Sequence, residues 1–407
     1  MNMMDTTALN DLSYSKSPPL ETGATQIQNI RFELVEDLIA VRSDWQALEA
    51  QTFCTPFQTY AWTHAWRTHV TSTADVHPAI IIGRDDNDAV QVILPLALRK
   101  QGPVTILEWL AGDHASYSGG LFRTALLNSL NRAEFLSLWA KITELLPPFD
   151  IAQFLAQTPM LNAHVNPTTY LGTKDSASTY FRITIDADFE ALHLDRRSRT
   201  TRRSERRRER HLSELGPLMF EAHYEGSTQE QATDVMFEQR SARFTEQGIH
   251  DFLADPGVAD FYRALTKMTM QAHGIEGFVS TLSVGDTIAA GLLNITHNNI
   301  NYALVSSMTT DEAMRKPSPG EILMRNTLKH CCEKGMDAYD CGGGYDIYKD
   351  SWSDLKFHTL DTVSPQTILG SAYAGSYNGF LAAKSHIKQS PTLWKAFKVC
   401  RKLGFWS

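Results

Sequence analysis

The residues whose types and spacing best suit chemistry lie in one short segment, residues 340–352. It reads Asp-Cys-Gly-Gly-Gly-Tyr-Asp-Ile-Tyr-Lys-Asp-Ser-Trp. Three consecutive glycines leave the backbone open to a ligand, and Lys349 supplies a movable positive charge suited to a phosphate or an acyl oxygen. Because an apolar run ends at Asp340, the segment is predicted to be a loop that follows a strand. The alternative is a mobile glycine-rich loop that binds nothing.

Four side chains of this segment are candidate catalytic residues. Asp340 is the candidate carboxylate for acid–base chemistry, and Asp346 is a second carboxylate near the glycines. Tyr345 and Tyr348 could protonate a leaving group or steady a substrate. Lys349 could pair with a phosphate or polarise a carbonyl, and a solvent-exposed lysine is the alternative.

A predicted helix start lies upstream of the glycines, at residues 316–321. Ser318 suits an N-cap, Pro319 suits the first helical position, and Glu321 would complete a capping box. The run 300–307 is strand-like, so the predicted order is strand, loop, helix, strand, glycine loop. Free amides at such a helix start could bind a pyrophosphate, although an ordinary capped helix without a ligand is the alternative.

The order of these motifs resembles the C-terminal half of the CelD-type acetyltransferases, a branch of the GNAT superfamily named from exopolysaccharide operons. The shared pattern is SPG at a helix start, YD at a strand end, glycines, and YKxxW at 348–352. Residues 44–66 resemble the family's opening helices, and 94–98 and 110–117 resemble its first meander and the loop after it. More distantly, the chain resembles the Fem-type peptidyltransferases, which have an FKxxF-like element in place of YKxxW.

The resemblance implies an α/β (α+β) fold class: a tandem duplicated GNAT-like fold in which each half is a mixed, mainly antiparallel sheet flanked by helices. The sequence itself supports a duplication, because two sets of three short strands recur, each with polar turns. These predicted strands are 79–82, 90–98 and 105–110, and then 278–284, 287–295 and 301–307. Two unrelated meanders are the alternative.

Four segments are expected along the chain. Residues 1–28 are polar and rich in Ser and Thr, and we expect a disordered leader. Residues 29–180 would form the N-terminal GNAT-like domain, and 181–365 the C-terminal one, which carries the acyl-donor site. Residues 366–407 would form a helical tail, whose end at 393–406 mixes aromatic and cationic side chains. That tail could contact a membrane surface, or pack its apolar face on the second domain.

The resemblance also implies a donor site for acetyl-CoA or another acyl-CoA. It puts pantetheine along the strand that contains Val305 and Ser306, and the pyrophosphate near Ser318, Gly320 and Glu321. An amine would then attack the thioester directly, without a covalent enzyme intermediate. The chain lacks the Q/RxxGxG/A signature of better-known GNAT enzymes, so aminoacyl-tRNA, the Fem-type donor, is the alternative.

Candidate substrate-binding residues also follow from the resemblance. Arg240 and Arg243 resemble RxxR-like positions of the family and could bind an acidic acceptor, or form plain surface ion pairs. Asp113 and Tyr117 lie in the loop after the first meander. Trp352, which ends the YKxxW pattern, is included with them.

A cluster of nine arginines between Arg196 and Arg210 contrasts with the net charge of −8 for the whole chain. It could be a solvated or substrate-facing helix, or bind an anionic substrate, lipid or polysaccharide surface. Nucleic acid is a further alternative, but no aromatic side chains for base stacking alternate with the arginines.

Composition narrows the class of protein. The 407 residues, 43% hydrophobic and 21% charged, are enough for two globular domains. No apolar stretch reaches the roughly 18 to 20 residues that cross a bilayer. The five cysteines form no CxxC pair, which favours a reducing cytoplasm and predicts no metal.

Three functions fit these observations. The first is an acyl-CoA-dependent N-acyltransferase that acts on an amino sugar or another small amine, in envelope or exopolysaccharide metabolism. The second is a Fem-like aminoacyl-tRNA-dependent transferase. The third is a non-catalytic partner of a polysaccharide synthase, for which Lys349 would be dispensable.

Overall fold

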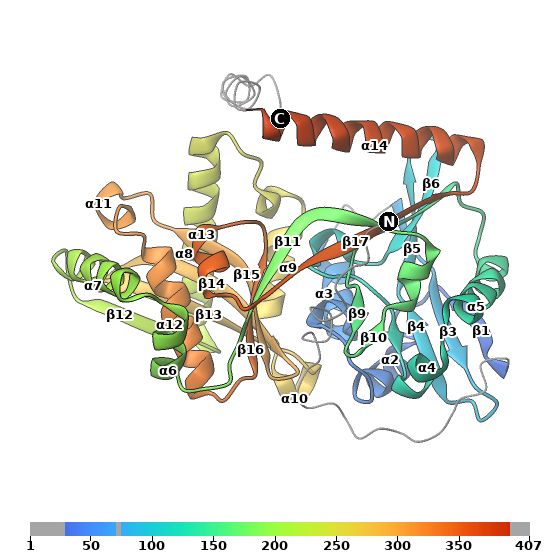
Figure 1. Cartoon of the computed structure of the whole chain (residues 1–407), viewed down its shortest axis with the longest axis horizontal. Helices are drawn as coiled ribbons and strands as arrows, with labels where there is room; N and C mark the ends of the chain where they lie inside the picture. Colours follow the sequence, from blue (N-terminus) through green and yellow to red (C-terminus); the bar gives the residue numbers. More distant parts are fainter. Residues whose placement is uncertain (1–28, 71–74, 391–407) are drawn as a thin grey trace. The chain divides into compact units, whose positions relative to one another are not determined.

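The computed structural model describes residues 29–70 and 75–390 (Figure 1). The predicted leader and the cation-rich end of the tail lie outside these residues. The chain divides into two compact units. Within the described residues, unit 1 comprises 29–67, 75–179 and 357–380, and unit 2 comprises 68–70, 180–356 and 381–390.

The sheet of unit 2 is antiparallel except for one strand pair. Its strand order is β12-β13-β14-β15-β16-β11, and only β15 and β16 run parallel. These strands are β11 (Lys174–Thr184), β12 (Leu218–His223), β13 (Glu276–Val284), β14 (Thr287–His297), β15 (Ile300–Met308) and β16 (Ala338–Gly343). The meander predicted at 278–307 is therefore confirmed.

Helices complete unit 2. They are α6 (Phe189–Arg196), α7 (Arg199–Ser213), α8 (Gly226–Gln247), η6 (Phe252–Ala254), α9 (Val258–Thr266), α10 (Met270–His273), α11 (Glu312–Arg315), α12 (Pro319–Glu333) and α13 (Ile347–Trp352). The α8 helix packs against Gly291, where a Cβ would lie 3.0 Å from Met236. Thr327 of α12 donates instead to Ser280 at 3.0 Å. Ser280 opposes Leu292, the neighbour of Gly291, so α8 and α12 cover opposite faces of the sheet.

The parallel pair β15 and β16 opens towards one end. The two strands pair only over 300–302 and 338–340, and α12 connects them. A bulge in β15 at Leu304 bends it at this point, because Leu293 opposes Val305 while Asn294 opposes Ala303. Among the described strands, β15 has only β14 as a neighbour from Ala303 onward. One edge of β15 is therefore available to a ligand.

The α12 helix begins where the sequence predicts, but the capping box is wrong. Ser318 adopts the left-handed region at φ 60° and makes no side-chain cap bond. The Glu321 N–H donates to the Ser318 carbonyl at 3.2 Å. The Glu321 carboxylate pairs with Arg208 of α7 instead. The Glu321 carboxylate thus forms an ion pair with the Arg208 guanidinium in place of the capping hydrogen bond at the helix start.

The glycines that follow β16 form a sharp turn. Gly342 and Gly344 have φ of +72° and +86°, which side chains with a Cβ rarely adopt. Gly343 has no room for a side chain, because a Cβ would lie 2.8 Å from the Tyr180 ring. The turn is therefore held by packing, and α13 starts directly after it.

The described part of unit 1 contains two larger sheets and one two-stranded hairpin. The first has the order β1-β3-β4-β7, and the second contains the order β17-β8-β6-β5-β2. The strands are β1 (Arg31–Val35), β2 (Val76–Pro78), β3 (Ile80–Arg84), β4 (Val90–Leu94), β5 (Leu96–Gln101), β6 (Val104–Trp109), β7 (Leu121–Phe122), β8 (Ile151–Gln157) and β17 (Leu355–Pro365). The single strand predicted at 90–98 is wrong: it is two strands in different sheets, because Pro95 has no N–H for a ladder.

The first half of the chain also contains helices and a short hairpin. These are α2 (Arg42–Glu49), η2 (Pro56–Gln58), α3 (Tyr60–His69), η4 (Gly112–His114), α4 (Thr124–Ser129), α5 (Arg132–Leu145), β9 (Met160–Leu161), β10 (His164–Val165) and η5 (Pro167–Leu171). The parallel strands β6 and β8 are connected through α5, as β15 and β16 are through α12. The predicted fold class is therefore confirmed, with related strand–helix–strand units in both halves.

Unit 1 includes a strand from much later in the chain. The partner of β8 is β17, whose paired residues follow unit 2, whereas the partner of β16 is the end of β11, Tyr180–Thr184, at the start of unit 2. After β17, α14 (Ile368–Gln389) begins in unit 1, where Ala374 packs with Val104, Ile106 and Ile151. The predicted boundaries at 180 and 365 stay predictions. The compact units assign 357–380 to unit 1.

Candidate active site

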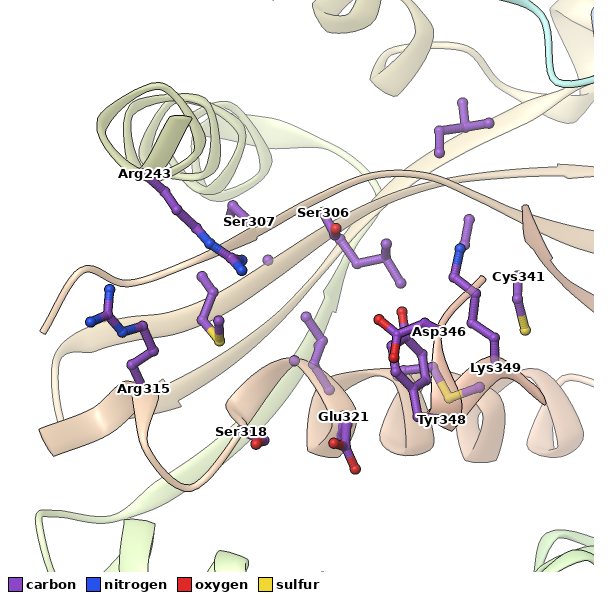
Figure 2. A pocket seen from close by; sticks show the side chains of 18 of the residues that line it. Arg243, Ser306, Ser307, Arg315, Ser318, Glu321, Cys341, Asp346, Tyr348 and Lys349 are labelled. Atoms are coloured by element: carbon purple, nitrogen blue, oxygen red, sulfur yellow. The ribbon is translucent and has the colours of Figure 1, made fainter. Parts of the chain in front are cut away.

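A pocket of about 320 Å³ lies in unit 2 where β15 and β16 diverge. Its walls come from α8, β14, β15, the loop before α12, α12 itself, β16 and α13. Figure 2 shows that charged side chains lie at both ends of the pocket, with β15 and the start of α12 between them. All lining residues belong to unit 2.

Two arginines lie at one end of the pocket. Arg243 comes from α8 and Arg315 from α11, and both side chains lie at the same end (Figure 2). Arg315 has one weak partner, Glu246, at 3.7 Å, and Arg243 has no ion-pair partner within the described part of the chain. Both guanidinium groups therefore retain hydrogen-bonding capacity for an anion.

The beginning of α12 lies between the arginines and the other end. Ser318, Gly320 and Glu321 all line the pocket, and their predicted contact with a pyrophosphate stays a prediction. Gly320 lies in open space, because a Cβ built there meets no atom within 4 Å. The first amides of a helix have no acceptor within the helix and carry the positive end of its dipole. Neither packing nor backbone conformation requires a glycine at position 320. The structural effect of this glycine is the space that it leaves for a ligand.

The strand β15 forms another wall. Ser306 is exposed and lines the pocket, together with Leu304 and Ser307. Val305, predicted to bind the cofactor, is only 1% exposed and does not line the pocket. This prediction is wrong because the Val305 side chain is buried in the core.

The other end of the pocket holds four groups that can exchange protons. Asp346, Tyr348, Lys349 and Cys341 lie together there (Figure 2). Lys349 Nζ donates to the Gly343 carbonyl at 2.9 Å, which ties the lysine to the glycine turn. Burial lowers the pKa of Lys349 from its ordinary value, and nearby negative charges oppose that shift only in part.

Burial keeps the two weak acids of this end protonated at neutral pH. It raises the pKa of Tyr348, and it raises the pKa of the Cys341 thiol to about 12. A thiol with such a pKa is a poor nucleophile, because the thiolate is the reactive form. Tyr348, in contrast, remains available as a proton donor.

Asp340 does not serve as an accessible acid or base. It is buried and forms an ion pair with Arg182 of β11 at 2.7 Å. Its other oxygen accepts the Gly342 N–H at 2.9 Å. The predicted acid–base role of Asp340 is therefore wrong, since the residue holds the glycine turn. Tyr345 is 72% exposed and lies outside the pocket lining.

Two predicted substrate-binding residues are structural instead. Trp352 is 2% exposed, stacks on His193 and lies under the Arg197 guanidinium. Arg240 pairs with Asp251 at 3.1 Å and lies over two phenylalanine rings. Burial lowers the pKa of Arg240 even so. Neither side chain lines the pocket.

The substrate-binding residues predicted in the first half lie in unit 1. Tyr117 is fully buried, with its ring stacked on Phe357 and in edge contact with Phe57. Its predicted contact with a substrate is therefore wrong. Asp113 is exposed on η4, and its role stays a prediction.

Arg315 is the pocket residue that sequence reasoning missed. The available signal was its place just before the loop Lys316-Pro317-Ser318 that enters a predicted helix. Its orientation depends on α11, a single turn that the sequence pattern did not reveal. Among the described residues, no group of three or more His, Cys, Asp or Glu side chains is placed to bind a metal ion.

Comparison with known proteins gave a family match within unit 2. Residues 199–350 match the family model of the acetyltransferase (GNAT) domain. The match begins at α7 and includes every residue that lines the pocket. No match was found among curated proteins.

The chain is also similar in fold to several solved structures. The crystal structure of FemX matches 81% of this chain and 96% of its own, with a TM-score of 0.53 and 11% identity, which concerns the fold alone. A tandem GNAT protein from the clavulanic acid biosynthesis pathway matches 83% of this chain and all of its own, at TM-score 0.45 and 12% identity. L-PGS from Bacillus licheniformis matches 78% of this chain and 94% of its own, at TM-score 0.43 and 8% identity.

Proposed function

We propose that the unit 2 pocket binds an acyl-CoA and transfers its acyl group to an amine. The observation that supports this most is the polarity of the pocket. Arg243 and Arg315 lie at one end, Asp346, Tyr348 and Lys349 lie at the other, and the start of α12 lies between them. Acyl-CoA has the same polarity, with phosphates at one end and a thioester at the other.

The phosphates fit the arginine end. Guanidinium groups bind phosphate oxygens through paired N–H donors, and helix N-termini bind anions through free amides. Pro319 offers no N–H, so Gly320 is the first amide of α12 that can donate. The Gly320 position also leaves space for a diphosphate to approach the backbone.

The pantetheine arm fits the free edge of β15. From Ala303 onward this edge has no described strand beside it, because β16 diverges. An extended chain with amide groups can bond to such an edge as an added strand does. The thioester would then lie near the bulge at Leu304 and close to Lys349.

The chemistry requires two proton transfers. The amine nitrogen attacks the thioester carbonyl, the new C–N bond forms, and the C–S bond breaks. Asp346 takes the proton that the attacking nitrogen loses, and the Tyr348 hydroxyl gives its proton to the leaving thiolate. Lys349 and free amides of β15 stabilise the developing oxyanion. Cys341, which stays a thiol, forms no acyl intermediate.

The acceptor proposal goes beyond the pocket. An amino sugar or another small amine, in envelope or exopolysaccharide metabolism, rests on the resemblance to CelD-type acetyltransferases in the sequence. A second candidate function is aminoacyl transfer from tRNA, as in Fem-type enzymes. The fold similarity to FemX favours keeping it as the competing hypothesis.

Isothermal titration with acetyl-CoA and longer acyl-CoAs tests the donor. The double variant Arg243→Gln/Arg315→Gln is expected to weaken acetyl-CoA binding by about tenfold or more, because hydrogen bonds to charged groups contribute roughly 1.5–3 kcal/mol each. Acetyl-pantetheine, which has no diphosphate, should bind both proteins equally. Release of free CoA thiol in the presence of amino sugars then tests transfer.

The matched control is Arg206→Gln/Arg210→Gln, which removes the same charge from unit 2 outside the pocket lining. It should leave acetyl-CoA binding unchanged. If no acyl-CoA binds to the wild-type protein, the proposal is wrong, and aminoacyl-tRNA becomes the donor to test.

A further inference from the structure

The helix α7 separates its charges onto two faces. Its sequence mixes arginines with Glu205 and Glu209, which suggests internal charge balance. In the structure both glutamates point from α7 towards other elements of unit 2. Glu205 is 2.8 Å from both Arg197 and His193, and Glu209 pairs with Arg325 of α12. The acidic side chains of this face are therefore paired within the protein.

Two arginines of α7 also have structural partners. Arg208 pairs with Glu321 at the start of α12. Arg202 donates to the carbonyls of Leu194 and Arg197 at 3.1 and 3.0 Å, which caps the end of α6. Burial opposes ionisation of Glu205, but hydrogen bonds from His193 and Arg197 outweigh it and lower the pKa of Glu205. These contacts explain the inner face and leave the outer face unexplained.

The outer face of α7 carries an arginine stripe. We define the stripe as Arg199, Arg203, Arg206, Arg207 and Arg210, all exposed. Positions 199, 203, 206 and 210 are three or four residues apart, so they lie along one side of the helix. None of the five pairs with a carboxylate within the described part of the chain. Like charges at this spacing repel each other, so an anionic partner would relieve a cost that the protein does not relieve itself.

Exposed apolar side chains flank the stripe. Leu194 on α6 is 60% exposed and Leu215, just after α7, is 49% exposed. Arg202 binds the Leu194 carbonyl, so Leu194 lies beside the first turns of α7. The α7 sequence contains no aromatic residue on which a nucleic acid base could stack. Arginines flanked by exposed leucines suit a lipid surface, where the cations meet phosphates and the leucines enter the interface.

We propose that the arginine stripe docks unit 2 on a bilayer that contains anionic phospholipids. The lipid phosphates lie against the five guanidinium groups, and Leu194 and Leu215 contact the boundary with the acyl chains. This docking is peripheral. No helix among residues 29–70 and 75–390 is long and apolar enough to cross a membrane. The proposal is independent of the acyl-CoA site.

Flotation of the full chain with vesicles tests the docking. Vesicles of phosphatidylcholine with about one third phosphatidylglycerol should bind the protein at about 0.05 M salt and release it at about 0.5 M, because salt screens the attraction. Pure phosphatidylcholine vesicles should not bind it. The variant Arg199→Gln/Arg203→Gln/Arg206→Gln/Arg210→Gln should lose more than about tenfold in vesicle affinity.

The matched control is Lys100→Gln/Arg132→Gln/Lys141→Gln/Lys174→Gln. These four side chains are exposed, lie in the first half of the chain and carry the same total charge. The control should bind the vesicles as the wild type does. Circular dichroism shows whether the stripe variant is folded, and Leu194→Ser/Leu215→Ser, which leaves every arginine in place, should weaken binding as well.

Three outcomes would overturn the proposal. Equal losses in the stripe variant and the control would mean that only total charge matters. An unchanged stripe variant would mean that another segment, such as the tail beyond residue 390, binds the lipid. Binding of bulk duplex RNA, but not of anionic vesicles, would identify nucleic acid as the partner of the stripe.

Discussion

Burial separates the two aspartates that flank the glycine turn. Asp340 is sealed behind the turn with Arg182, and both side chains are at most 4% exposed. Asp346 is exposed and faces the pocket. Two carboxylates six positions apart in the sequence therefore have different surroundings: Asp340 holds the turn, and Asp346 is the proposed proton acceptor. Burial, which the sequence pattern did not reveal, decides between them.

The two aspartates should respond differently to removal of their charge. Asp340→Asn leaves Arg182 buried without its counter-ion, and breaking such a pair costs roughly 3–5 kcal/mol of unfolding free energy. Asp346→Asn should change stability by less than about 0.5 kcal/mol, while the rate of acyl transfer falls. Urea denaturation and initial rates measure the two effects. Equal stability losses in both variants would contradict this assignment.

The lowered pKa of Lys349 predicts the direction in which the unfolding free energy changes with pH. Between the folded-state pKa and the ordinary value of 10.5, the unfolded chain binds a proton that the folded protein does not. Stability from this residue therefore rises with pH across that window, and the cost of burying the charge is complete below it. The unfolding free energy of wild type minus that of Lys349→Met should increase as pH rises towards 10.5.

Denaturant titrations of both proteins at several pH values measure this difference. Other groups titrate in the same range, and they cancel in the subtraction as long as their surroundings are unchanged. A flat difference would mean that Lys349 has an ordinary pKa in the folded protein. The pair Lys349 and Gly343 would then be more hydrated than its burial indicates.

At the scale of elements, the start of α12 combines two requirements. A helix favours Ala over Gly by about 1 kcal/mol. The chain nevertheless has Gly320 in the first turn, at a site with ordinary backbone conformation and open space around it. Stability alone would favour replacement of this glycine. Its presence is explained if a ligand approaches the backbone there.

Gly320→Ala should therefore improve folding and impair binding. The unfolding free energy is expected to rise by about 0.4–1 kcal/mol, because alanine restricts the unfolded chain and fits a helical backbone. The dissociation constant for acetyl-CoA should increase, because the methyl group occupies space above the Gly320 amide. Thermal unfolding and titration calorimetry on the same samples measure both. Unchanged affinity in a stabilised variant would place the diphosphate elsewhere.

Much of the fold of unit 2 could be predicted from local sequence. The strands 276–308 alternate with clear turns, and Pro319 marks the beginning of α12. Lys349, Tyr348 and Gly320 line one pocket because they lie at the ends of these elements, and their roles stay predictions. Val305 and Trp352 were misassigned because sequence spacing does not show which face a side chain occupies.

At the scale of the whole molecule, the partners of β11 and β17 could not be predicted. A strand's own residues show that it pairs, but the choice of partner depends on contacts far along the chain. Local patterns also gave boundaries at 180 and 365, close to the two strands that change unit. The physical signal for the pairing of β11 with β16 is Arg182, a cation on a buried strand that requires an acidic partner, which Asp340 supplies from far along the chain.

The pairing of β8 with β17 predicts that the first half cannot fold stably alone. A chain of residues 29–186 would contain β8 without β17, and Ile106 and Ile151 without the α14 residue Ala374 that covers them. If β11 moved onto β8 instead, Arg182 would be buried without Asp340, which costs several kcal/mol (roughly 3–5). We expect this fragment to aggregate on expression, and co-expressed residues 355–390 to restore a soluble complex in size-exclusion chromatography.

The fragment with Arg182→Leu is the informative control, because it removes the cost of moving β11. If this variant alone became soluble, the buried cation would be what keeps β11 on β16. A cooperative unfolding transition in the unmodified fragment would show that the first half folds without β17.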